Sequence, residues 1–94
     1  MTKTYQYQSK IYAAQQKGAA YTIFPYNIRE EFGKGRVKVH ITFDGIPYDG
    51  SIVNMGLKDN DGNIIYIIGI RKAIQETIRK GIGDSVAITV TERD

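Results

Sequence analysis

Residues 36–45 read RVKVHITFDG, and this stretch decides the fold class. From Val37 to Phe43, apolar residues occupy every second position and alternate with basic or polar residues. Successive side chains of a β-strand point to opposite faces, so this pattern predicts a strand with one buried face. Asp44 and Gly45 follow at once, and this dipeptide favours the two-residue turn of a β-hairpin. The chain is therefore expected to build its core from antiparallel strands.

Three further segments have the character of strands. Residues 85–91 repeat the alternation with valine and isoleucine, and residues 5–11 alternate tyrosine and isoleucine with polar side chains. Residues 64–70 are almost continuously apolar, which predicts a central strand that is covered on both faces. The seven tyrosines, three phenylalanines and many isoleucines favour strands in the chain as a whole.

Two segments interrupt the strand pattern and predict short helices. Residues 27–33, NIREEFG, begin with an asparagine suited to the N-cap, place isoleucine and phenylalanine four positions apart, and end on glycine. Farther along, Ile70, Ile74 and Ile78 recur every four residues among basic and polar side chains, and Gly81 follows them. This spacing predicts a longer amphipathic helix that ends at Gly81.

Strand, helix and strand occur in that order twice, over residues 21–43 and 66–90. Neither copy can bury its apolar face alone, so the two halves are expected to cover each other about a pseudo-two-fold axis. We predict a mainly β single domain over residues 1–94, a six-stranded closed or half-open barrel that is built from these two strand–helix–strand halves and capped by two short helices. Because one chain supplies both halves, no strand exchange is needed, and a monomer is expected.

The composition excludes several classes of protein. A length of 94 residues suits one domain with a modest core. Cysteine is absent, which excludes disulfides, thiolate catalysis and cysteine-based zinc sites. No apolar run approaches the roughly 20 residues of a membrane-spanning helix. The first dozen residues contain no apolar segment of the secretory type. We therefore expect a cytoplasmic protein without membrane contacts.

Five motifs stand out along the chain, and they are IFPYNIREEFG at residues 23–33, GRVKV at 35–39, FDGIPYDGS at 43–51, IRKAI at 70–74 and GDSV at 83–86. Together they resemble a bacterial family, the domain of unknown function numbered nineteen-oh-five. The resemblance covers nearly the whole chain and implies a double-split β-barrel, the fold of AbrB-like transcription regulators and antitoxins. The family has no established activity and therefore implies no functional residues.

Basic side chains provide a candidate nucleic-acid interface. The formal net charge is +3, and the excess of positive charge lies wholly within residues 1–50. Arg36, Lys38 and His40 fall on the polar face of one predicted strand, where they could follow a phosphate backbone. Arg71 and Lys72 make the second predicted helix basic. The alternative interpretation of both groups is an ordinary solvated surface.

A calcium-loop interpretation of residues 59–63, DNDGN, fails on spacing. Oxygen-bearing side chains alternate there as they do in an EF-hand loop, but Ile64 and Ile70 occupy the positions that require glycine and glutamate. This stretch therefore predicts a turn. One histidine with basic neighbours is a poor set of ligands, and we expect no bound metal and no cofactor.

Two tyrosines beside prolines, Tyr26 and Tyr48, are the best candidates for an exposed aromatic pair that binds a ligand. No nucleophile and base can be paired from the sequence, because the only histidine has no carboxylate beside it along the chain. We therefore expect a non-catalytic binding domain for a small ligand or a protein partner. The alternative hypothesis is a nucleic-acid-binding or regulatory module.

Overall fold

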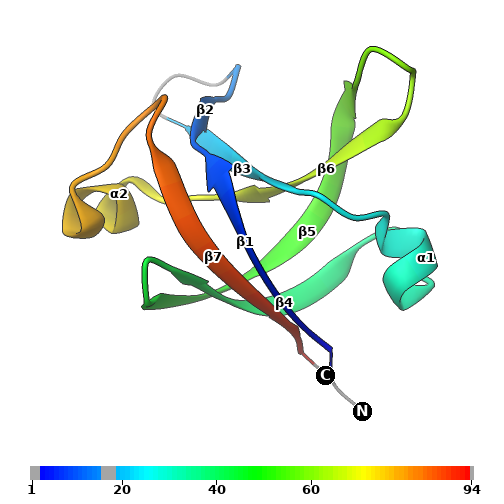
Figure 1. Ribbon diagram of the computed structural model, residues 1–94, viewed down its shortest axis with the longest axis horizontal. Coiled ribbons are helices and arrows are strands. Elements are labelled where there is room, and N and C mark those ends of the chain that lie inside the picture. The colour runs from blue at the N-terminus through cyan, green and yellow to red at the C-terminus, as the bar shows by residue number, and fades with distance from the viewer. Residues whose placement is uncertain (1–2, 16–18, 94) are drawn as a thin grey trace.

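The structure is a computed structural model that describes residues 3–15 and 19–93. Strands dominate it, and the two short helices lie at opposite ends of the view, α2 at the left and α1 at the right (Figure 1). The elements in chain order are β1 (Thr4–Lys10), β2 (Tyr12–Ala13), β3 (Ala20–Phe24), α1 (Ile28–Phe32), β4 (Val37–Phe43), β5 (Ile46–Lys58), β6 (Ile64–Gly69), α2 (Lys72–Ile78) and β7 (Ser85–Glu92).

All the strands belong to one curled antiparallel sheet. Their order is β1-β7-β4-β5-β6-β3-β2, so β1 and β2 lie at its two edges although only Ile11 separates them in the chain. The mainly β fold with two short helices agrees with the prediction, but the described residues form seven strands rather than six. The reason is that the predicted first strand breaks at Ile11: β1 pairs with β7, whereas β2 pairs with β3.

Ile11 joins the two edges of the sheet. Its N–H donates a hydrogen bond to the carbonyl oxygen of Asp84 at 2.9 Å, and its own carbonyl accepts the N–H of Gly83 at 2.8 Å. Its side chain is 1% exposed and belongs to the core. Across the same junction the N–H of Ile23 donates to the hydroxyl of Ser9 at 3.0 Å. The bonds of Ile11 continue the pairing of β1 with β7, whereas the Ile23–Ser9 hydrogen bond joins β3 to β1, so the two edges of the curled sheet meet beside one buried residue.

The predicted alternation of β4 is confirmed and supplies the middle of the core. Its residues are buried at every second position, while Lys38 and His40 point to solvent. Strand β7 pairs with β4 in a register that sets Ile41 opposite Val90 and Phe43 opposite Ile88. The fully buried side chains of these two strands are Val37, Val39, Ile41, Phe43, Val86, Ile88 and Val90.

The predicted hairpin at Asp44 and Gly45 is also confirmed. Both residues have positive φ angles, 49° and 88°, as a two-residue hairpin loop requires. One carboxylate oxygen of Asp44 accepts the N–H of Ala87 at 2.8 Å, and the other lies 2.7 Å from the ammonium of Lys80. The Lys80 hydrogen bond, together with that from Ala87, lowers the pKa of Asp44 below its ordinary value of 3.8. The carboxylate thus fixes this turn against β7 and the chain segment after α2.

Both helices form where they were predicted. The Asn27 side chain accepts the N–H of Arg29 at 2.9 Å and so caps α1, and Gly33 ends that helix with a φ of 69°. Helix α2 ends earlier than predicted, because Arg79 rather than Gly81 adopts the left-handed conformation, with a φ of 57°. Within the described ranges no helix is long and apolar enough to cross a membrane.

Strand β6 is covered differently from the prediction. It lies inside the sheet between β5 and β3, but β5 is the middle strand. Tyr66 and Ile68 belong to the core, whereas Ile67 is buried without being part of it. Since successive strand residues point to opposite faces, Ile65 and Ile67 lie on the outer face of the sheet. The continuous apolar run therefore serves the core with one face only.

Substitution of the linking residue tests the closure. Ile11→Ala removes buried volume between the two edges and should lower the free energy of unfolding by about 3 kcal/mol. Ile82→Ala is the matched control, because the Ile82 side chain is 57% exposed and should change stability by less than about 0.5 kcal/mol. Urea unfolding followed by circular dichroism measures both, and equally small losses would contradict the role given to Ile11.

Asp44 makes stability depend on pH. A lowered folded-state pKa stabilises the fold at pH values above the ordinary pKa of 3.8, and this contribution disappears as the pH falls through the folded-state pKa. Asp44→Asn retains a residue that tolerates positive φ but removes the charge, and should cost about 1 kcal/mol at neutral pH. In unfolding measurements from pH 7 to pH 2, the two stability curves should converge at the acid end. Curves that remain parallel would show that the carboxylate charge is not responsible.

Candidate functional site

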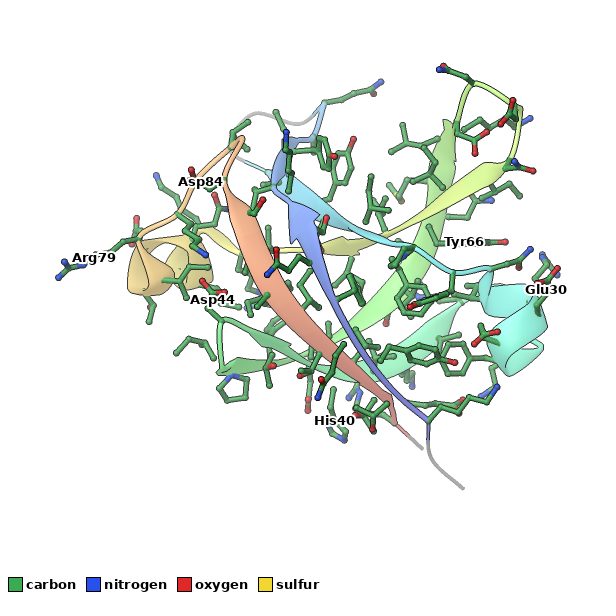
Figure 2. The ribbon with its side chains drawn as sticks, in the orientation of Figure 1. Glu30, His40, Asp44, Tyr66, Arg79 and Asp84 are labelled. Atoms are coloured by element: carbon green, nitrogen blue, oxygen red, sulfur yellow. The ribbon has the colours of Figure 1, made fainter. Side chains whose placement is uncertain are left out.

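A hollow of about 610 Å³ opens between the start of α1 and the turn that joins β5 to β6. Figure 2 shows Tyr66 and Glu30 at the right, on the side of the hollow. His40 lies at the lower edge of the view and Asp44 at the left. Volumes of this size are ordinary for small-molecule sites. The lining residues are Ile23, Phe24, Pro25, Tyr26, Asn27, Arg29, Asp59, Gly62, Asn63, Ile64, Ile65 and Tyr66.

An aromatic cluster supports Tyr26 on one wall of the hollow. The Tyr26 ring lies 5.2 Å from the ring of Tyr5 and 5.4 Å from that of Phe24, measured between centroids. Tyr5 is itself fixed, because its hydroxyl donates to Glu31 at 2.7 Å. Burial, followed by this hydrogen bond, raises the pKa of Tyr5 to about 12, so the hydroxyl stays protonated at neutral pH. Tyr26 remains 43% exposed and offers part of its ring to the hollow.

Arg29 supplies the positive charge of the hollow. The asparagine cap places it in the first turn of α1, where it is exposed. Its guanidinium lies over Gly35, where an added Cβ would come within 3.2 Å of a guanidinium nitrogen. Among residues 3–15 and 19–93, no carboxylate pairs with Arg29. The guanidinium is therefore available to an anionic group.

The Asp59 carboxylate, which lines the hollow, already accepts hydrogen bonds from its own turn. The Asp59 carboxylate accepts the N–H groups of Asp61 and Asn63, each at 2.9 Å. The hydrogen bonds from Asn63 lower the pKa of Asp59. These bonds form the predicted turn. In the part of the chain that the structure describes, no three His, Asp or Glu side chains gather as a metal site would require. Asp59 therefore shapes the wall of the hollow and is not free to bind a ligand.

The predicted basic stripe is interrupted by a carboxylate. Lys38 and His40 are exposed on β4, and Arg36 is exposed just before it. However, β5 places Asp49 directly opposite His40, and a carboxylate oxygen of Asp49 lies 2.5 Å from the Nδ1 of His40. The other carboxylate oxygen lies 3.9 Å from the guanidinium of Arg93. A phosphate backbone following β4 would therefore meet a negative charge halfway along.

The predicted aromatic pair is separated, and Tyr48 has a basic partner instead. The Nε of Arg71 donates to the hydroxyl of Tyr48 at 3.1 Å, and the guanidinium carbon lies 5.2 Å from the centre of the ring. Tyr48 is half-buried against Phe43. Lys72 begins α2 and is exposed. Only Tyr26 of the predicted pair lines the hollow, so the two tyrosines do not form one site.

A comparison with protein-family models decides the family. The model described as domain of unknown function DUF1905 matches residues 7–90. The chain belongs to the DUF1905 family. No curated protein matches the chain. The family assignment agrees with the resemblance drawn from the sequence motifs, and the hollow of this DUF1905 domain lies within the matched region.

Sequence reasoning missed two contacts of the DUF1905 domain for different reasons. The His40–Asp49 pair could have been predicted from the sequence, because a two-residue loop at Asp44 and Gly45 fixes the register that places these residues opposite each other. The role of Arg29 had no comparable signal. Its position beside the β5–β6 turn depends on pairing between β3 and β6, which are distant in the sequence.

Proposed function

We propose that this DUF1905 domain is a non-catalytic binding domain whose hollow beside Tyr26 takes a small molecule with a planar ring and an anionic group. The observation that carries the proposal is the combination, in one hollow of about 610 Å³, of an exposed aromatic ring and a guanidinium that pairs with no carboxylate of the described residues. A ring can stack on Tyr26, and a carboxylate or phosphate can take two hydrogen bonds from Arg29. Ile64, which is also exposed there, adds apolar contact.

The non-catalytic part of the proposal rests on where the titratable groups lie. His40 and Asp49 form the one histidine–carboxylate pair among the described residues, and both side chains are more than half exposed on an open strand face. Neither residue lines the hollow. A substrate at Tyr26 would therefore be remote from this pair, and enclosure from water, which strengthens acid–base chemistry, is missing at His40.

We also propose that the curled sheet is a double-split barrel made of two related halves, as in AbrB-like proteins. Corresponding strands of the predicted halves are neighbours, since β3 pairs with β6 and β4 pairs with β7. The strand before each half extends the correspondence. In the first half β2 pairs with β3, and in the second half β5 pairs with β6. In this barrel β1 and β2 count as one strand that bends at Ile11, so the seven strands become the six that such a barrel needs.

The ligand proposal predicts a local response to two simple probes. Adenosine monophosphate and benzoate both carry a planar ring and an anion. In ¹⁵N-resolved NMR titrations, at least one of them should shift amide signals around Tyr26, Arg29 and Asn63. Arg29→Gln should weaken that binding by about tenfold, because a charge-assisted hydrogen bond is lost.

Arg36→Gln is the matched control, since Arg36 is exposed but does not line the hollow. It should leave the affinity unchanged. Absence of shifts with both probes at millimolar concentration would refute the proposed ligand class. Equal losses in Arg29→Gln and Arg36→Gln would indicate a general charge effect instead of a site.

The nucleic-acid alternative is favoured by one observation, the exposure of Arg36 and Lys38 without ion pairs in the described ranges. If duplex DNA binds there, two cations predict a slope of log affinity against log salt near −2. Asp49→Asn removes the interrupting carboxylate and should strengthen binding, whereas Arg36→Ala with Lys38→Ala should abolish the slope. Absence of binding to random duplex DNA at about 50 mM salt would eliminate this alternative.

A further inference from the structure

The hollow beside Tyr26 lies where two paired strands separate. The pairing of β3 with β6 ends at Phe24, which lies opposite Tyr66. Pro25 follows Phe24 and has no N–H to donate, and the chain then turns into α1. In Figure 1 the two strands diverge toward the right, where β3 leads into α1 and β6 begins at the β5–β6 turn. The start of β6 therefore has no partner strand on this side.

The backbone of Ile64, the first residue of β6, points toward this gap. In an antiparallel sheet, successive residues direct their N–H and carbonyl groups alternately to one neighbouring strand and to the other. The N–H of Ile70 donates to the carbonyl of Ala20 at 3.1 Å, so even-numbered residues of β6 face β3. The N–H of Asp59 donates to the carbonyl of Asn63 at 2.9 Å, so odd-numbered residues face β5. Both observations turn the N–H and the carbonyl of Ile64 away from β5 and toward the hollow.

Neither of these two groups has a partner among residues 3–15 and 19–93. If β3 continued in the same register, Tyr26 would lie opposite Ile64, but no backbone hydrogen bond joins them. The bonds within the β5–β6 turn do not reach Ile64 either. Ile64 is 40% exposed and lines the hollow. One donor and one acceptor thus face the hollow at the spacing that one residue of an adjoining strand would use.

The gap accommodates one residue of such a strand and no more. Along β6 in one direction, Tyr66 already pairs with Phe24. In the other direction, the N–H of Gly62 donates to the carbonyl of Asp59 at 3.1 Å. The chemical complement of Ile64 is therefore a single residue that carries both an amide N–H and a C=O or carboxylate group. An N-acylated amino acid has these groups, and so does the C-terminal residue of a peptide.

We propose that the ligand of the hollow is an N-acylated aromatic amino acid. Its amide N–H donates to the carbonyl of Ile64, and its carboxylate accepts the N–H of Ile64 and the guanidinium of Arg29. Its ring lies against Tyr26. The inference rests on the proposed function, which requires a ring and an anion, and it adds the amide as the feature that selects among such molecules.

Three probes in ¹⁵N-resolved NMR titrations isolate the contribution of the amide. N-acetyl-L-phenylalanine carries the ring, the carboxylate and the amide. Phenylpropionate lacks the amide, and the N-methylated form of N-acetyl-L-phenylalanine lacks only the N–H. N-acetyl-L-phenylalanine should bind about tenfold more tightly than either of the others, because only it can donate to the carbonyl of Ile64. Its binding should also shift the amide signal of Ile64.

A proline at position 64 removes the N–H from the protein side. Ile64→Pro should leave the protein folded, because this N–H donates to no described residue and proline is tolerated at the first residue of a strand. It should weaken the binding of N-acetyl-L-phenylalanine by about tenfold. Ile64→Ala is the matched control, since it shortens the side chain but keeps the N–H, and it should cost less than about threefold. Thermal unfolding checks the fold of both variants, and the comparison of the three probes does not depend on them.

Equal affinities for N-acetyl-L-phenylalanine and phenylpropionate would overturn the inference and leave the proposed ligand class intact. Absence of shifts with all three probes at millimolar concentration would refute both. Equal losses in folded Ile64→Pro and Ile64→Ala would also overturn the inference. A tetrapeptide of three alanines and a C-terminal phenylalanine separates the two sources of the ligand. If it binds as tightly as N-acetyl-L-phenylalanine, the source is a peptide end, and if it does not bind, the source is a free acylated amino acid.

Discussion

The structure depends on how the two edges of one sheet meet at Ile11. An open sheet leaves unpaired N–H and C=O groups along both edges, and these invite pairing with other chains. Here the chain passes from β1 at one edge to β2 at the other through a single buried residue whose N–H and carbonyl both find partners. The curled sheet encloses Phe24, Ile41 and Phe43 in the core. It also fixes which residues of every strand point outward.

The outward residues determine what the domain can bind. On β4 and β5 the hairpin at Asp44 and Gly45 sets His40 beside Asp49, so a carboxylate lies next to the basic residues of β4. At the other end, pairing of β3 with β6 brings α1 and the β5–β6 turn together around Tyr26 and Arg29. The polar strand face thus follows from the register of β4 and β5, and the ring-and-cation hollow follows from the register of β3 and β6.

Much of this fold could be predicted where the signal is local. The alternation of β4, the turn at Asp44 and the Asn27 cap each depend on neighbouring residues, and each was correct. Two local features could not be foreseen. The pattern of the first strand continues through Ile11 without a break in polarity, and no residue type signals that Arg79 adopts a positive φ. The candidate site was harder to predict from the sequence, because the hollow and the Arg71–Tyr48 contact join segments that are distant along the chain.

Native-state hydrogen exchange of the Ile23 amide tests the meeting of the two edges most directly, since this amide of β3 donates to the hydroxyl of Ser9 on β1. If the two edges stay together there, the Ile23 amide should exchange only through global unfolding, with the same free energy as the amides of β4. Exchange of the Ile23 amide through a local opening, while β4 stays protected, would show that the edges separate in the native state and would contradict the account.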